Sequence, residues 1–114
     1  MPSTFMVNRD NAYLQEVLEH IVILEGFLCD VRQEDFLNHV EKQFAVARAF
    51  EIIGEASAKL SEELRSKHKE IDWRGLKAMR NILIHEYAYV DAEEMWKAWQ
   101  KEIPDLKRKI SRMI

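Results

Sequence analysis

Residues 10–30, "DNAYLQEVLEHIVILEGFLCD", decide the fold class. Their apolar side chains recur every three or four residues, which is the spacing of one face of an α-helix. The stripe consists of Tyr13, Leu14, Val17, Leu18, Ile21, Leu24 and Leu28, and Val31 continues it. Asp10 stands where a helix N-cap is expected. The stretch therefore predicts a long amphipathic helix that begins at Asp10 and buries one face.

The same spacing continues further along the chain. Apolar or small residues follow it at Phe36, Val40, Phe44, Ala47 and Gly54, and the pattern runs on to Leu64. With Asp35 as its cap, this pattern predicts one helix over 36–64, roughly 30 residues and long for a globular domain. Glycine inside a helix costs about 1 kcal/mol relative to alanine. We interpret Gly54 as a point where a crossing helix approaches the backbone closely.

The second half of the chain contains three further helix starts. Asp72 can cap a helix that begins at the next residue, and Asp91 opens a capping-box pattern. Pro104 suits the first turn of a short final helix, where its missing N–H is not needed. The chain has only three glycines and two prolines, which favours helices over a sheet. We therefore predict an all-α fold, an up-and-down four-helix bundle with a short fifth helix, in a single domain over 1–114.

The composition narrows the class of protein. The chain has 114 residues, of which 47% are hydrophobic and 32% charged, which is typical of a globular rather than a disordered protein. The net charge is −3, so the whole molecule does not attract nucleic acid, and any RNA contact needs a local basic patch.

The single cysteine, Cys29, excludes a disulfide within the chain and any cysteine-based zinc cluster. With apolar neighbours, we expect its thiol to be buried. We see no signal peptide, and no apolar stretch approaches the ~20 residues that span a bilayer. A cytoplasmic protein without a membrane partner is expected.

Residues 79–89, "MRNILIHEYAY", combine large aliphatic residues with an unusual polar set. On a helix that turns about 100° per residue, Arg80 and Tyr87 fall on one side. Asn81 and His85 lie one turn apart on an adjacent face. The arginine side chain is long enough to reach that face. The three polar side chains can therefore border one cleft, with the tyrosine at its edge.

These residue types can cleave RNA without a metal ion. His85 titrates near neutrality and can deprotonate a 2′-hydroxyl, which then attacks the adjacent phosphorus. Arg80 carries a permanent charge that binds phosphate oxygens and can stabilise the phosphorane. Asn81 can orient the histidine or donate to an oxyanion. Arg74 and Lys77 lie upstream on the same predicted helix and add positive charge for RNA binding.

A purely structural interpretation accounts for the same residues. Arg80 can pair with Glu86 or Asp91, and His85 can interact as a cation with the C-terminal dipole of its helix. The two tyrosines can be half-buried rings. The spacing alone favours this interpretation over catalysis.

Other polar and aromatic residues fit structural roles. Trp96 and Trp99 have helical spacing and are expected to fill a core rather than to stack on bases. The basic run "KRK" at 107–109 is expected on a solvated face. The remaining histidines lack ligand-like spacing, so no metal site is predicted. They are His20, His39 and His68.

The motif carries a family resemblance. "RNILIHEY", residues 80–87, has the form R-x4-H-x-Y with asparagine directly after the arginine, which is the signature of HEPN domains. The chain resembles the HepT-like branch, the toxins of HepT–MntA toxin–antitoxin pairs. "RDNAYLQEVLEHI", "EIIGEASAKL", "IDWRGLKAMRN" and "IPDLKRKI" are similar to segments of that family in the same order, so the resemblance covers nearly the whole chain. One departure is Asp72, where resembling members often have proline.

The resemblance implies an all-α homodimer in which the motif helices of two subunits meet. Ile82, which points away from the predicted core, would then be covered by the partner subunit rather than exposed to water. The implied activity is a metal-independent RNase without a cofactor. Arg80 and His85 form its catalytic pair, supported by Asn81, and transfer RNA and messenger RNA are the candidate substrates.

The resemblance also implies a partner, an MntA-like nucleotidyltransferase antitoxin. It would transfer AMP from ATP to Tyr87, which holds the motif position, although Tyr89 offers a second hydroxyl. AMP adds bulk and negative charge beside the cleft and would repel RNA. Two alternatives remain: a non-catalytic HEPN module that binds nucleotide or RNA or serves as an accessory subunit of a nucleotidyltransferase, and a purely structural helical dimer.

Overall fold

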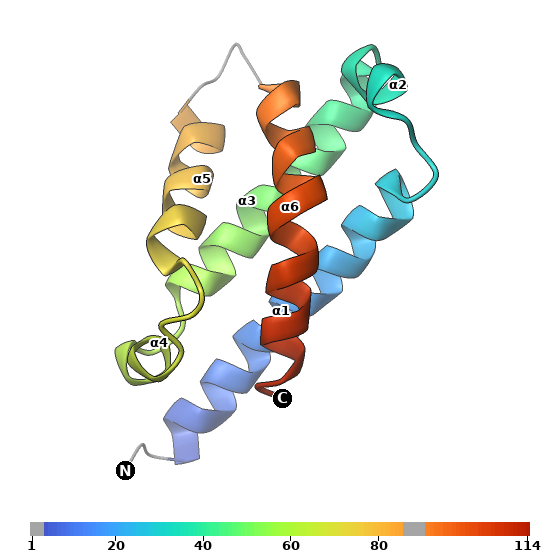
Figure 1. Ribbon diagram of the computed structural model, residues 1–114. Helices are drawn as coiled ribbons and strands as arrows, with labels where there is room; N and C mark the ends of the chain where they lie inside the picture. The colour runs from blue at the N-terminus through green and yellow to red at the C-terminus, as the bar shows by residue number, and fades with distance from the viewer. Residues whose placement is uncertain (1–3, 86–90) are drawn as a thin grey trace.

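The computed structural model describes residues 4–85 and 91–114, and these ranges are helical, without a strand (Figure 1). The predicted all-α bundle is confirmed. Four long helices make up the bundle, α1 (Thr4–Leu28), α3 (Val40–Ala58), α5 (Trp73–His85) and α6 (Ala92–Ser111). Two short helices, α2 (Gln33–Leu37) and α4 (Glu62–Lys67), flank α3 along the chain.

Helix α3 is the central helix of the bundle. It packs against α1 on one side and against α5 on another, and α6 crosses in front of it in Figure 1. The start of α1, α4 and the end of α6 lie toward one end, and α2 lies toward the other. The core combines apolar side chains of all four long helices, among them Leu14, Val17, Ile21, Leu24, Val46, Phe50, Ile53, Leu76, Ile103 and Ile110. The predicted stripe of α1 therefore faces the core.

Trp96 and Trp99 belong to this core, as predicted. Trp96 is buried, and its ring centroid lies 5.6 Å from that of Phe36. Trp99 is partly buried against the same cluster. The buried Trp96 ring is therefore not available to stack on a base.

The prediction of one helix over 36–64 is wrong, because side chains end the helix at two places. His39 is the N-cap of α3, and its Nδ1 accepts the Lys42 N–H at 3.0 Å. His39 is therefore not part of a continuous helix, although the predicted 36–64 helix included it. Ser61 is the N-cap of α4, and its hydroxyl accepts the Leu64 N–H at 3.1 Å. Side-chain caps of this kind compete with helix continuation, and a hydrophobic stripe does not reveal them.

Asp10 is not the N-cap of the first helix. Helix α1 begins at Thr4, and Asp10 lies within it, buried. Its carboxylate accepts two hydrogen bonds from Ser61, from the N–H at 2.8 Å and from the hydroxyl at 2.6 Å. The carboxylate thus sits at the N-terminal end of α4, where the unpaired N–H groups of a helix favour negative charge. Asp10 therefore caps a different helix, 51 residues away in sequence.

The predicted fifth helix is not separate, since α6 runs through Pro104. Proline inside a helix removes one backbone hydrogen bond. On either side of it, Ile103, Leu106 and Ile110 are buried in the core. This continuous apolar stripe holds the helix together across the proline.

Two smaller predictions have opposite outcomes. Asp91 caps α6 as predicted, and its carboxylate accepts the Glu94 N–H at 3.0 Å. Cys29 is exposed, so the prediction of a buried thiol is wrong. It follows the end of α1 at Leu28, which takes the buried position instead. None of the helices within the described ranges is long and apolar enough to cross a membrane.

Candidate functional site

Helix α5 carries the motif positions from Arg80 to His85, and it crosses α3 at Gly54. A Cβ atom at Gly54 would lie 2.8 Å from the Cβ of Arg80 and 2.9 Å from the carbonyl oxygen of Leu76. Real Cβ atoms do not approach their neighbours this closely, so only glycine permits the contact. The predicted close approach at Gly54 is confirmed. Gly54 therefore sets how deeply α5 lies against α3, and with it the position of Arg80.

The start of α5 is fixed by its own cap. The Asp72 carboxylate accepts the Gly75 N–H at 2.9 Å, which confirms the predicted cap. A Cβ at Gly75 would lie close to that carboxylate, so a larger residue there would require the Asp72 side chain to shift. The Trp73 indole donates to the carbonyl oxygen of His68 at 2.9 Å. The helix consequently begins at a defined residue, and its faces have a defined orientation.

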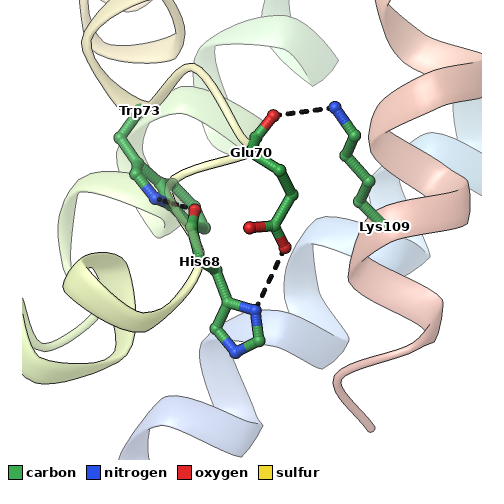
Figure 2. A network of polar contacts seen from close by, with 4 residues as sticks. All are labelled: His68, Glu70, Trp73 and Lys109. Atoms are coloured by element: carbon green, nitrogen blue, oxygen red, sulfur yellow. Dashed lines mark hydrogen bonds and ion pairs between the residues drawn. The ribbon is translucent and has the colours of Figure 1, made fainter.

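A polar network holds the segment before α5 against α6 (Figure 2). The Lys109 ammonium, from α6, donates to the carbonyl oxygen of Glu70 at 2.7 Å. The Glu70 carboxylate lies 3.2 Å from Nδ1 of His68. The backbone N–H of Glu70, and to a smaller extent the bond to His68, lower the pKa of this carboxyl. The network anchors the segment before the motif helix to α6.

The structure places the predicted catalytic residues on α5 but does not describe all of their side chains. Arg80 is half-buried beside Gly54. The backbone positions of Asn81 and His85 belong to α5, one turn apart, and their side chains lie outside the described part. Tyr87 and the second tyrosine lie outside the described residues. A shared cleft of arginine, asparagine and histidine therefore stays a prediction, as does the partner-covered position of Ile82.

The helical register groups the basic residues with two motif positions. Arg74, Lys77, Asn81 and His85 are three, four and four residues apart, and all four positions belong to α5. Positions with this spacing share one face of a helix. The side chains of Arg74 and Lys77 are both exposed. Positive charge therefore lies on the same face of α5 as the motif positions.

A hollow of about 500 Å³ lies beside these basic residues, between α5, α4 and the end of α3. We call it the α4-side hollow. Its lining contains one carboxylate and four cations; it consists of Ser57, Ala58, Glu62, Arg65, Ser66, Lys69, Trp73, Arg74 and Lys77. Arg65 and Lys69 were missed from the sequence, because they follow the predicted 36–64 helix and belong to no motif. A sequence signal for a basic patch was present, because four of the five residues of "RSKHK", 65–69, are arginine, lysine or histidine.

A second hollow of about 450 Å³, which we call the α6-side hollow, lies between the start of α5 and α6. It contains four carboxylates and three cations. Its charged lining residues are Glu70, Asp72, Lys101, Glu102, Asp105, Arg108 and Lys109. Within the described ranges, no group of three or more histidine, cysteine, aspartate or glutamate side chains is placed to hold a metal ion.

The sequence is similar to known proteins over most of its length. Residues 17–113 match the model of a protein family described as Ribonuclease HepT-like. The chain is 43% identical over 101 residues to "Probable ribonuclease HepT" of Thermococcus cleftensis, which covers 89% of this chain and 92% of that protein. It is 34% identical over 110 residues to "Putative RNase MJ1216" of Methanocaldococcus jannaschii, covering 96% and 91%. No solved structure matches.

Proposed function

The chain belongs to the HepT-like ribonuclease family, and we propose on that premise that it is a metal-independent endoribonuclease, the toxin of a toxin–antitoxin pair. The observation that carries the proposal is the match over residues 17–113, which includes the complete R-x4-H-x-Y motif. Within this proposal the whole chain acts as one HepT-like domain, in the cytoplasm. The basic face of α5 supports RNA as the substrate, because it supplies the local patch that an acidic protein needs to bind a polyanion.

The proposed chemistry uses three residues of α5. His85 takes the proton of a 2′-hydroxyl, whose oxygen forms a bond to the adjacent phosphorus. The bond from phosphorus to the 5′-oxygen breaks, and that oxygen takes up a proton from the protonated imidazole or from water. The products carry a 2′,3′-cyclic phosphate and a 5′-hydroxyl. Arg80 stabilises the extra charge on the phosphorane, and Asn81 orients the imidazole or donates to the same oxygens.

A homodimer completes the proposed site. The motif helices of the two subunits would face one shared cleft. That cleft would contain the basic residues of both subunits. Arg74 and Lys77 of both subunits would then concentrate positive charge around the RNA. Packing at Gly54 restricts the conformations of the half-buried Arg80 stem, which would fix the position of its guanidinium in such a cleft.

The proposed regulator is an MntA-like nucleotidyltransferase antitoxin. It would transfer AMP from ATP to Tyr87, with Tyr89 as the alternative acceptor. The added phosphate places negative charge next to the RNA path, which disfavours binding of another polyanion. The substitution Tyr87→Phe is expected to abolish the modification in co-expressed protein.

A non-catalytic HEPN module is the second candidate, and the α4-side hollow favours it. The cations of that hollow could bind RNA without any chemistry at the motif. The protein could also bind a nucleotide, or dock on the nucleotidyltransferase as an accessory subunit. This alternative predicts RNA binding that does not depend on His85.

A nuclease assay tests the two candidates. Unmodified protein is incubated with single-stranded RNA or transfer RNA in the presence of a chelator, and products are separated by electrophoresis. We expect wild-type protein to cleave and His85→Ala to lose about 10²- to 10⁴-fold in rate, as for loss of a general base. His20→Ala, on α1, is the control and should keep full activity. Equal cleavage by wild type and His85→Ala, or none by unmodified wild type, would favour the binding module.

A further inference from the structure

We propose that the α4-side hollow is an anchoring site for the RNA backbone, separate from the motif and reached by the same strand. The inference rests on the proposed function for its substrate, and it assigns a role to Arg65 and Lys69, which lie outside the motif helix. Four features of the described residues carry it: unpaired charge, a fixed guanidinium, an aromatic wall and a shared helix face.

The cations of the hollow are not neutralised by the protein. Within the part of the chain that the structure describes, the side chains of Arg65, Lys69, Arg74 and Lys77 take part in no ion pair. By contrast, Lys67, on the same short helix, pairs with Glu63 at 3.3 Å. Glu62 is the single carboxylate in the lining. The hollow therefore presents net positive charge, whereas the neighbouring surface of α4 does not.

Arg65 is the anchor of this group. The residue is half-buried, and its Nε is buried without a hydrogen-bond partner. A buried N–H without a hydrogen-bond partner is energetically unfavourable. Burial of Nε restricts the orientations of the guanidinium before any ligand arrives. A guanidinium held in advance loses less conformational entropy when a phosphate binds to its outer N–H groups.

Trp73 gives the hollow an aromatic wall. The ring is half-buried, and its indole N–H is bonded to the carbonyl oxygen of His68, which fixes the ring plane. An aromatic surface beside several cations is the combination that binds single-stranded nucleic acid, because cations follow the backbone and rings contact bases. The proposed nuclease function supplies a single-stranded ligand that would use both the charges and the ring. This favours RNA over a protein partner.

The hollow and the motif lie along one path. Lys77 lines the hollow, and His85 lies eight residues further on the same face of α5. Eight residues of α-helix span about 12 Å. This distance corresponds to roughly three stacked nucleotides at about 3.4 Å each. A short oligonucleotide at the motif cannot also occupy the hollow, whereas a longer strand can.

A binding experiment tests the proposal without depending on catalysis. The probe is 2′-O-methyl RNA, which lacks the free 2′-hydroxyl that cleavage needs, in lengths of 2 and 16 nucleotides. Affinity is measured by fluorescence anisotropy over a range of salt concentrations. The test variant is Arg65→Gln/Lys69→Gln. Its matched control is Arg48→Gln/Lys67→Gln. The control removes the same number of positive charges, but from residues that form ion pairs with Glu51 and Glu63.

We expect the test variant to bind the 16-mer at least about tenfold more weakly. The slope of log K against log salt should fall by about 0.7 for each phosphate that the variant no longer neutralises. Binding of the dinucleotide should be unchanged in both variants, and the control should bind the 16-mer like wild type. Because Arg65 is partly buried, Lys69→Glu alone provides a second variant on an exposed side chain. It should also weaken binding of the 16-mer, with an unchanged helical circular dichroism spectrum.

Three results would overturn the proposal: equal weakening by test and control variants, an unchanged affinity for the 16-mer, or an equal loss with the dinucleotide. Unchanged RNA affinity with weaker binding of a protein partner would assign the hollow to that partner. The nuclease assay reports separately on the proposed function. An inactive wild type whose 16-mer binding still depends on Arg65 and Lys69 would refute the RNase and keep the anchoring site.

Discussion

Two hollows of similar size flank the start of α5, but their charges are used differently. In the α6-side hollow, Lys109 bonds to the Glu70 carbonyl and pairs with Asp105 at 2.8 Å, and Arg108 pairs with the same carboxylate. In the α4-side hollow, the four cations have no ion pair within the described ranges, and only one carboxylate is present. In the first hollow, Lys109 therefore links α6 to the segment before α5, and Arg108 is occupied within α6. The second hollow leaves positive charge for a ligand.

If the α4-side hollow binds RNA as proposed, the absence of ion pairs, and not the density of basic residues, distinguishes it as a nucleic-acid site. The most basic short run of the C-terminal half, 107–109, is fully paired, because Lys107 also contacts Glu25 at 2.9 Å. Basic residues in the α4-side hollow are scattered along the sequence from Arg65 to Lys77 and come together only through the turn between α4 and α5. Three predictions probe this comparison.

The largest effect is expected from charge reversal in the two hollows. Arg74→Glu/Lys77→Glu should lower the affinity for single-stranded RNA about 100-fold or more at low salt, because two attractive contacts become repulsive. Lys101→Glu/Arg108→Glu, with the same change in net charge, should change it by less than about threefold. Filter binding at two salt concentrations measures both. Similar losses in the two variants would mean that total charge, and not the α4-side hollow, controls binding.

The second effect concerns α5 itself, which both hollows share. Gly54→Ala introduces a Cβ that would lie 2.8 Å from Arg80, so α5 must move away from α3. We expect a loss of about 1–3 kcal/mol in the free energy of unfolding, as for overpacking, and about a tenfold loss of nuclease activity. Chemical denaturation and the nuclease assay measure the two losses.

Gly26→Ala is the matched control for this change. A Cβ at Gly26 meets nothing within 4 Å, and the position is exposed near the end of α1. Alanine there should stabilise the protein by about 0.5–1 kcal/mol and leave activity unchanged. Equal stability of Gly54→Ala and wild type would show that α3 and α5 are not in firm contact at Arg80.

The sequence predicted the parts of the fold that depend on periodicity or on local caps. The core face of α1, the caps at Asp72 and Asp91, and the helix crossing at Gly54 all agree with the structure. Each depends on residues within a few positions of one another, or on the cost of glycine in a helix. Local physics is sufficient for such features.

The errors and omissions depend on contacts between distant residues. Asp10 has the residue type of an N-cap, but its partner is Ser61, and no pattern in either segment reveals this pairing. Helix α4 starts where that contact forms, so the break in the predicted 36–64 helix was also hidden. Arg65 and Lys69 join Arg74 and Lys77 only because α4 turns back toward α5. The α4-side hollow was therefore not predictable from spacing along the chain.

The smallest effect is expected in the α6-side hollow, and it depends on pH. The hydrogen bond from the Lys109 ammonium, helped by its charge and those of Arg108 and Arg112, lowers the pKa of Asp105 in the folded protein. A carboxyl whose pKa is lowered on folding stabilises the folded state above its unfolded pKa. That contribution disappears as the pH falls through the folded pKa. Lys109→Met should therefore be less stable than wild type at neutral pH, and the difference should shrink in acid.

The readouts for Lys109→Met are the NMR titration of the Asp105 carboxyl and denaturation at neutral and acid pH. The pKa of Asp105 should rise toward its usual value, and part of the loss at neutral pH should persist in acid, because the bond to the Glu70 carbonyl does not titrate there. RNA affinity should match wild type, because this cation is occupied by the protein itself. A marked loss of RNA binding would show that Lys109 serves a ligand as well as the fold, and the contrast between the two hollows would no longer hold.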